Sequence, residues 1–452
     1  MWSEYNILRT VRIRYPQMAR ILPQALLAIT EEGGDFGEIT VVRVDHLRVV
    51  RDVTVFADSP QHMERIVARL AGLPRLEILE VRDEVLEMHQ GGKIAVRTRY
   101  PVDSIRALRR VYTPGVAEVC RLIAEDTEQA WRYTSIHHLV AIVTDGTAVL
   151  GLGDIGPVAG MPVMEGKAAL MESLVGLSGM PILLNTKDPQ RIVETVEAIA
   201  PTFGAIQLED ISAPRCFEIE EELIRRLDRP VMHDDQHGTA VVVLAVLLNA
   251  MRRAGKELTA VQVGQIGLGA AGLAVARLTM KVAGRPVLGA DLDPEATARL
   301  ERSGGRRSTL EEIMENCDVV VATTGAPGLI KPEMVRAGQV ILALSNPVPE
   351  IEPETAMAAG AAFAADGKTV NNVLGFPGIL RGAVDARVPW ITDEMYLAAA
   401  NTIADSAPEG KLVPDPLDRS LHRRVARAVA RTALDQGLAR GDLTGYFEDE
   451  TP

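Results

Sequence analysis

The sequence predicts an α/β protein in three parts: an N-terminal ferredoxin-like βαββαβ module, a second α/β domain and a Rossmann-type domain. Strand-length apolar runs alternate with helical patterns along most of the chain. Aromatic residues make up only 4% of the sequence, and small or branched residues carry its apolar content, which suits helices packed on parallel strands. Since 452 residues are many for one domain, we place the domains at 1–88, 95–238 and 239–452.

Charge and composition exclude several classes of protein. The net charge of −13 argues against a nucleic-acid partner, because binding to phosphates needs a basic surface. The start of the chain does not resemble a signal peptide, and its longest apolar run, 239–251, is too short to cross a bilayer. The three cysteines stand far apart without metal-type spacing. We therefore expect a soluble cytoplasmic protein that is not bound to membranes.

The first 88 residues alternate between strand and helix patterns. The expected strands cover 7–15, 38–47, 49–57 and 76–86, and the expected helices cover 16–32 and 60–71. This β-α-β-β-α-β order resembles an ACT domain, which implies a regulatory or dimerisation module. Because no sharp ligand motif supports it, a small-molecule effector site and a plain dimerisation module are equally expected. Gly91-Gly92 then forms a natural linker.

Two turns precede the densest cluster of polar motifs. Tyr112 comes just before a Thr-Pro-Gly turn in VYTPGVAE, which would place its phenol at a surface facing a cleft, although a tyrosine there is more often a packing residue. The segment 141–156 (AIVTDGTAVLGLGDIG) suggests two strands joined at Asp145-Gly146, a hairpin signal. Its glycine-rich end lacks the βαβ context of a dinucleotide loop, so we interpret it as a loop on the substrate side.

Lys167 lies in an otherwise apolar helical stretch within MEGKAALM. Burial disfavours the ammonium form, so we expect its pKa to fall toward the range where the amine accepts a proton. The alternative is a lysine whose charged end reaches solvent. The apolar neighbours make the catalytic interpretation at least as favourable.

Carboxylates follow two further strand-like runs. IQLEDI ends in Glu209 and Asp210, and VMHDDQHGTA contains Asp234 and Asp235. Open α/β sheets place their sites at the carboxyl ends of strands. Glu209, Asp210 and one of the other two acids therefore predict an oxygen-ligand site for Mg²⁺ or Mn²⁺. Either acidic pair alone would be interpreted as solvated surface residues.

The clearest local motif is GLGAAG, which comprises Gly267, Leu268, Gly269, Ala270, Ala271 and Gly272. A short strand precedes it, a helix follows, and the next strand ends at Asp291. This is the Rossmann fingerprint: the glycines let the backbone approach a pyrophosphate, and the acid binds the ribose 2′-hydroxyl. Since a carboxylate repels a 2′-phosphate, we expect NAD rather than NADP as cofactor. Asn346 and Asn372 follow later runs and can donate to ligand oxygens, though turn residues are the default interpretation.

Together these segments resemble malic enzymes of the bacterial type. VYTPGVAE, VLGLGDIG, EGKA, QLEDI, HDDQHGTA, GLGAAG, SNP and NNVLGFPG occur in the family's order, over about residues 95–430. The resemblance implies metal-dependent oxidation and decarboxylation of (S)-malate to pyruvate and CO2 with reduction of NAD. It also implies a homodimer or a higher homo-oligomer.

Carried over by motif, Lys167 matches the general base and Tyr112 the general acid. Glu209, Asp210 and Asp235 match the metal ligands. Asn346 and Asn372 match positions that contact substrate and nicotinamide. One departure is visible: the arginine that animal malic enzymes carry in their Asp-Gly turn is absent, because Thr147-Ala148 follow here. Two alternatives stay open, a malolactic-type enzyme that retains NAD and makes lactate, and a regulatory protein that lost turnover.

Overall fold

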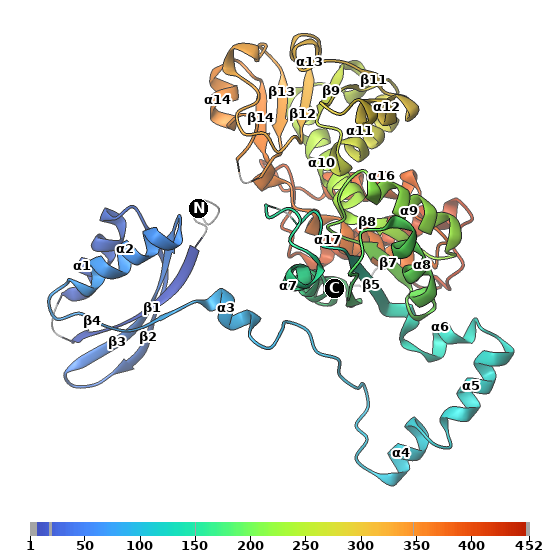
Figure 1. The fold of residues 1–452 in the computed structure, drawn as a ribbon, viewed down its shortest axis with the longest axis horizontal. Coiled ribbons are helices and arrows are strands. Elements are labelled where there is room, and N and C mark those ends of the chain that lie inside the picture. Colours follow the sequence, from blue (N-terminus) through green and yellow to red (C-terminus); the bar gives the residue numbers. More distant parts are fainter. Residues whose placement is uncertain (1–6, 18–19, 150, 347, 449–452) are drawn as a thin grey trace. The chain divides into compact units, whose positions relative to one another are not determined.

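The computed structural model describes residues 7–17, 20–149, 151–346 and 348–448. The chain divides into two compact units, Met1–Ala95 and Val96–Pro452 (Figure 1). Each unit has its own hydrophobic core. Among the residues described, no helix is long and apolar enough to cross a membrane.

The first unit has the βαββαβ order expected from its patterns. Its elements are β1 (Ile7–Pro16), α1 (Ile21–Glu31), β2 (Asp35–Val44), β3 (Arg48–Ala57), α2 (Pro60–Ala71) and β4 (Glu77–Arg82). The strands form one antiparallel sheet in the order β2-β3-β1-β4. Alternate residues of the central strands, such as Val11 and Val53, pack with Ile29 and Ile66 of the two helices. The last strand is shorter than expected, because Asp83 caps a short helix, α3 (Glu84–His89).

The second unit contains two parallel sheets. The first has the order β6-β5-β7-β8 and consists of β5 (Leu139–Thr144), β6 (Ser178–Leu183), β7 (Ala205–Leu208) and β8 (Val231–His233). The helices that follow its strands are α7 (Pro157–Val175), α8 (Pro189–Ile199) and α9 (Arg215–Arg226).

The hairpin expected at Asp145-Gly146 is wrong. The turn exists, but β5 pairs in parallel with β6 and β7, and the described residues 147–149 and 151–156 form no second strand and lie in a glycine-rich loop. Among the described residues of this loop, the expected pairing is reduced to one bridge, between Val149 and Gly153. Strands from later in the chain pair with both edges of β5, and all of its residues except Leu139 are buried.

The second parallel sheet has the order β11-β10-β9-β12-β13-β14, the 3-2-1-4-5-6 arrangement of a doubly wound dinucleotide-binding fold. Its strands are β9 (Val263–Ile266), β10 (Leu288–Ala290), β11 (Arg306–Arg307), β12 (Val319–Ala322), β13 (Val340–Ala343) and β14 (Phe363–Asp366). The helices between them are α11 (Ala270–Ala283), α12 (Pro294–Arg302), α13 (Leu310–Asn316) and α14 (Pro353–Ala358).

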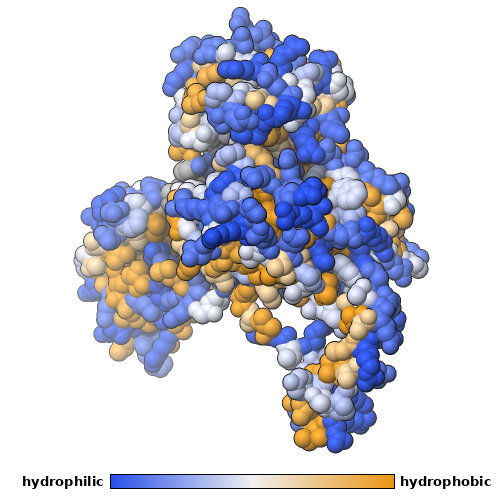
Figure 2. All heavy atoms as spheres, turned by 45° about the vertical axis from the view of Figure 1, so that its right-hand side comes forward, coloured by the Kyte–Doolittle hydropathy of each residue, from blue (hydrophilic) through white to orange (hydrophobic). Residues whose placement is uncertain are grey.

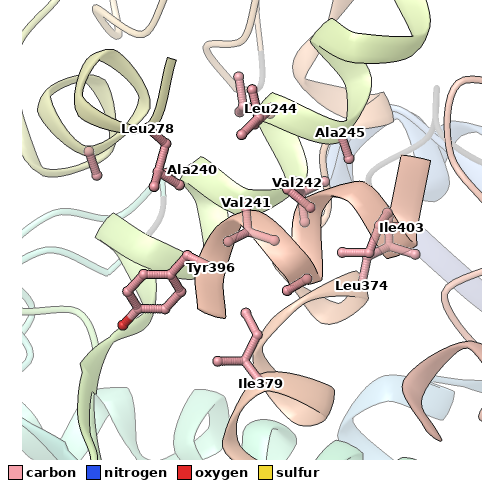
Figure 3. Packing of buried hydrophobic residues seen from close by; sticks show 14 of the residues in the cluster. Ala240, Val241, Val242, Leu244, Ala245, Leu278, Leu374, Ile379, Tyr396 and Ile403 are labelled. Carbon is pink, nitrogen blue, oxygen red and sulfur yellow. The ribbon is translucent and has the colours of Figure 1, made fainter. Parts of the chain in front are cut away.

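A long helix, α10 (Asp234–Ala254), connects the two sheets. It is apolar on nearly all sides, and Figure 3 shows Val241 and Val242 surrounded by side chains of α11, α16 and the segment before α15. The remaining helices are α15 (Phe376–Asp385), α16 (Asp393–Asp405) and α17 (Arg419–Asp435). The domain boundary expected at 238/239 thus falls inside a continuous buried helix.

The start of the second unit differs from the rest of it. Its helices α4 (Ile105–Val111), α5 (Val116–Glu125) and α6 (Gln129–Tyr133) contain no buried residue. A short 3-10 helix, η1 (Ser135–His138), then leads directly into β5. We call residues 96–134 the arm. Figure 1 shows α4 and α5 leading away from β5, and Figure 2 shows hydrophobic side chains gathered on the same projection.

Candidate active site

Three carboxylates converge at the carboxyl end of the first parallel sheet. Glu209 and Asp210 follow β7, and Asp235 lies in the first turn of α10 directly after β8. One oxygen of each side chain lies within 4.8 Å of the other two. The loops after β5 and β7, where the strand order reverses, frame this position. The expected three acids are therefore brought together, and of the two adjacent aspartates it is Asp235 whose oxygen lies with those of Glu209 and Asp210.

The cluster is electrostatically unfavourable without a cation. Burial and the neighbouring Asp235 carboxylate raise the pKa of Asp210 to about 7, and burial raises the pKa of Glu209 well above its usual value. One buried oxygen of Asp210, Oδ2, accepts no hydrogen bond. Asp210 also has a left-handed backbone with φ of +54°, and its amide donates to Asp235 Oδ2 at 2.9 Å. These residues fit a hard divalent cation, whose preferred ligands are carboxylate oxygens.

Lys167 lies in α7 beside this cluster and is only 8% exposed. Its Nζ is 3.0 Å from Glu209 Oε1, hydrogen-bonds to Asp234 Oδ2, and lies 4.6 Å from the centre of the Phe376 ring. The expectation that the Lys167 pKa falls is wrong. Burial does disfavour the ammonium, but the carboxylates of Asp234 and Glu209 outweigh it and raise the Lys167 pKa. The lysine is therefore a buried ammonium held by two acids.

Asp234 connects the lysine to a predicted substrate residue. Its buried Oδ2 also accepts a hydrogen bond from Asn372 Nδ2 at 2.8 Å. Asn372 begins a 3-10 turn just before α15, so it comes from a segment 138 residues further along the chain. Gly238 makes room for this carboxylate, because a Cβ there would lie 1.8 Å from Asp234 Oδ1. Asp234 therefore fixes Lys167 and Asn372 relative to the acidic cluster.

Several residues that support the acidic cluster were not predicted from the sequence. Gln207, buried in β7, donates to Glu209 Oε2 at 2.6 Å. His233 lies with its Nε2 3.1 Å from Asp235 Oδ2, and Glu220 accepts from the His233 amide at 2.7 Å. Polar residues inside an apolar strand such as AIQL were the available signal for Gln207. His233 and Asp235 are two residues apart where β8 meets α10, whereas Glu220 comes from α9, and no local pattern reveals that contact.

An arginine contacts the Asp145-Gly146 turn, but it comes from the start of α9 and not from the turn itself. Arg215 at the start of α9 lies with Nη1 3.0 Å from Asp145 Oδ2, and its Nη2 donates to Thr147 Oγ1 at 2.9 Å. Asp145 is fully buried, so the ion pair holds the turn against α9. The amides of Thr147 and Ala148 in turn donate to the carbonyl of Asp210.

The glycine loop of the second sheet has the geometry of a dinucleotide-binding turn. Gly267 has a φ of +84°, and a Cβ on Gly272 would lie 2.0 Å from the Gly267 carbonyl oxygen. Gly269 is the N-cap of α11, and no atom lies near its missing side chain. Asp291 follows β10, and its Oδ2 accepts from the amide of Leu268 at 2.6 Å. Asp291 thus lies against the glycine loop.

Buried polar side chains form hydrogen bonds within the glycine loop and between the neighbouring loops of the second sheet. Gln265 in β9 donates to the carbonyl of Gly267 and to Thr323 Oγ1, which explains the modest apolarity of its strand. Glu350 is fully buried and accepts from the amides of Thr324 and Ser345, so it joins the loops after β12 and β13. Asn346 directly follows Ser345 and is exposed. It lies beside Gly367, since a Cβ on that glycine would lie 2.7 Å from Asn346 Nδ2.

Tyr112 is the one predicted catalytic residue that the single chain does not bring to this cluster. It is the C-cap of α4 in the arm and is 68% exposed. Within the residues that the structure describes, its side chain makes no hydrogen bond or ring contact.

A dinucleotide-binding sheet beside a buried lysine and a carboxylate cluster defines an enzyme of the dehydrogenase class. The chain belongs to the malic enzyme family. It is 53% identical over 431 residues to NAD-dependent malic enzyme 1 of Bacillus subtilis, with 95% of this chain and 98% of that protein covered. The NAD-dependent malic enzyme of Geobacillus stearothermophilus is 42% identical, with 96% of each chain covered.

Domain-level and structural comparisons agree with this assignment. The family model for the malic enzyme N-terminal domain matches residues 92–224, and the model for the malic enzyme NAD-binding domain matches residues 292–434. The NAD-binding domain of D-isomer specific 2-hydroxyacid dehydrogenases matches residues 233–327. The crystal structure of malic enzyme from Pyrococcus horikoshii superposes with a TM-score of 0.75 at 40% identity, covering 80% of this chain and 92% of that one.

Proposed function

We propose that this protein oxidises (S)-malate and decarboxylates the product to pyruvate and CO2, with reduction of NAD. The observation that carries the proposal is the contact between Lys167 and the acidic cluster, in which Nζ lies 3.0 Å from Glu209 at the carboxyl end of β7. A base for the C2 hydroxyl and ligands for a divalent cation are thereby adjacent. The names of the relatives support the same reaction.

In this proposal Lys167 reacts from its neutral amine form, and its Nζ receives the proton of the C2 hydroxyl while the C2 hydride leaves for the nicotinamide. Cleavage of the bond between C3 and C4 then releases CO2 and leaves the enolate of pyruvate, to which Tyr112 delivers one proton at C3. Asp234 holds Lys167 Nζ in place through its hydrogen bond, and Asn372, bonded to the same carboxylate, would line the position of the substrate.

Glu209, Asp210 and Asp235 would hold the Mg²⁺ or Mn²⁺. When bound, such a cation supplies Lewis acidity at the substrate oxygens, and it neutralises Glu209, one of the charges that keep Lys167 protonated. The GLGAAG loop with Gly267, Gly269 and Gly272 would bind the pyrophosphate of NAD. Asp291 would accept from the ribose, and Asn346 would contact the nicotinamide side.

For the unit Met1–Ala95 we propose an ACT-like role in regulation or dimerisation. Its sheet order, β2-β3-β1-β4, and the helices on one face support the ferredoxin-like module. This unit lies almost entirely outside the matched family models, which begin at residue 92. Both a small-molecule effector and simple pairing of copies are compatible with it.

A steady-state assay with (S)-malate and a divalent cation tests the proposed reaction. We expect NADH and pyruvate to form, with kcat/KM for NAD at least about 10-fold above that for NADP, because 1.4 kcal/mol of repulsion between Asp291 and a 2′-phosphate already gives this factor. Lactate without net NADH would indicate the malolactic-type reaction instead. A preference for NADP would contradict the role of Asp291.

A further inference from the structure

Arg215 at the start of α9 uses both of its η nitrogens on the loops that border the acidic cluster. Nη1 donates to the carbonyl of Lys187 at 2.6 Å and lies 3.0 Å from Asp145 Oδ2. Nη2 donates to the hydroxyls of Thr147 and Ser212, each at 2.9 Å. The Asp145 side chain is completely buried, so its charge is balanced by this guanidinium inside the protein. Arg215 therefore holds the turn after β5 against α9 and against the loops after β6 and β7.

The hydroxyl of Thr147 connects this arginine to the segment after β7. It donates to Asp145 Oδ1 at 2.6 Å and accepts from Arg215 Nη2. It also accepts from the Ser212 amide at 3.0 Å. Since a hydroxyl has one hydrogen and two lone pairs, all of its hydrogen-bonding positions are filled. The orientation of Thr147 is thus fixed from three sides.

The same turn fixes the backbone of Asp210. The amides of Thr147 and Ala148 both donate to the Asp210 carbonyl, at 3.1 and 2.9 Å. Asp210 has a φ of +54°, a left-handed conformation that a residue other than glycine keeps only when its surroundings determine it. The two amide donors supply part of that determination. The direction in which the Asp210 carboxylate enters the acidic cluster therefore depends on the turn that Arg215 holds.

We propose that Arg215 is a positioning residue for the divalent cation, and that it acts through Thr147 and the backbone of Asp210. The inference rests on the proposed function, in which Asp210 is one of three ligands to the metal. Arg215 does not belong to the acidic cluster, and its η nitrogens contact the turn and the two adjoining loops. It affects the cation indirectly, by holding the turn that determines the Asp210 conformation.

Charge alone would give Arg215 the opposite effect. A guanidinium beside a cation site repels the cation, so loss of that charge should tighten the binding of Mn²⁺. Loss of the positioning contacts should weaken it, because Asp210 is released from the conformation that directs its carboxylate into the cluster. A residue that only stabilises the fold would lower the melting temperature and leave the dissociation constant of the folded protein unchanged. The sign of the change in Mn²⁺ affinity separates these three roles.

Direct binding of Mn²⁺ to the stripped protein, followed by electron paramagnetic resonance, tests the inference. We expect Arg215→Met to raise the dissociation constant by about 10- to 100-fold, the range for loss of an outer-shell partner of a metal ligand. The kcat at saturating Mn²⁺ should change far less, because Lys167 and Asp234 keep their contact. A dissociation constant equal to or below that of the wild type would overturn the inference.

A double variant keeps the test valid if Arg215→Met does not fold because Asp145 is left as an unpaired buried charge. Asp145→Asn/Arg215→Met removes one negative and one positive charge, so its net charge equals that of the wild type. It still lacks the bonds from the guanidinium to Thr147 and Ser212. We expect the same direction of change in Mn²⁺ affinity, and wild-type affinity in this variant would contradict the positioning role.

Arg225 provides the matched control on the same helix. Its side chain is 68% exposed and pairs with Glu222, so Arg225→Met should leave the dissociation constant for Mn²⁺ unchanged. Equal weakening in Arg225→Met and Arg215→Met would overturn the inference, since any arginine of α9 would then have the same effect. Binding of Mn²⁺ to the wild type is measured first, and its absence would contradict the proposed metal site itself.

Discussion

Replacing Lys167 with methionine is expected to lower kcat by about 10²- to 10⁴-fold, because the site loses the group that accepts the hydroxyl proton. Methionine keeps most of the side-chain volume beside Phe376, so packing is largely retained. The KM for malate should change far less, since Asn372 and the acidic cluster remain. Steady-state kinetics with saturating NAD and Mn²⁺ measure both quantities.

A matched lysine on the surface controls for this substitution. Lys281 in α11 is half exposed and pairs with Asp393, so Lys281→Met should leave kcat within a factor of two or so of wild type. Loss of activity in Lys281→Met as well would point to a general effect of removing lysine. Wild-type turnover in Lys167→Met would remove the lysine from the reaction.

Asp235→Asn is expected to weaken Mn²⁺ binding by at least about 100-fold. Loss of an outer-shell partner alone lowers metal affinity by up to about 100-fold, and Asp235 is proposed as a direct ligand. The change removes one of three carboxylates that converge within 4.8 Å. Its side chain is 31% exposed and already hydrogen-bonded by the Asp210 amide, so the amide replacement fits the same space. Titration of the stripped protein with Mn²⁺, followed by electron paramagnetic resonance, gives the dissociation constant.

The neighbouring residue provides the comparison. Asp234→Asn makes the same change in charge, but Asp234 bonds Lys167 and Asn372 and is not one of the three converging acids. We expect it to reduce kcat more than metal affinity. Equal losses of Mn²⁺ affinity in both variants would mean that the cluster attracts the cation by charge alone, without the ligand geometry inferred here.

Features encoded within short segments were predictable from the sequence. The strand, glycine turn, helix and acid around Gly267 are consecutive, and the structure reproduces them with Asp291 bonded to the loop. The acids after β7 and β8 were also predictable, since carboxyl ends of parallel strands meet at one edge. Adjacent acids could not be ranked by spacing. Only the start of α10 shows Asp235 facing the cluster and Asp234 facing the lysine.

Features that depend on distant partners were not predictable. The apolar neighbours of Lys167 suggested a lowered pKa, but its main partner, Asp234, lies 67 residues away and reverses the shift. The Asp145-Gly146 turn suggested a hairpin because it is a local signal, whereas the pairing of β5 is decided by β6 and β7. Tyr112 was assigned by motif, and its exposed position at the end of α4 in the arm has no local signature.

The most direct test of the central claim, that a carboxylate-held cation and Lys167 together oxidise malate, is removal of metal from the wild-type protein. Protein stripped with EDTA should form no NADH from (S)-malate and NAD. Addition of Mn²⁺ should restore activity along a saturable curve whose midpoint matches the dissociation constant from direct binding. Full activity in the stripped protein, with no bound metal detected, would contradict the account.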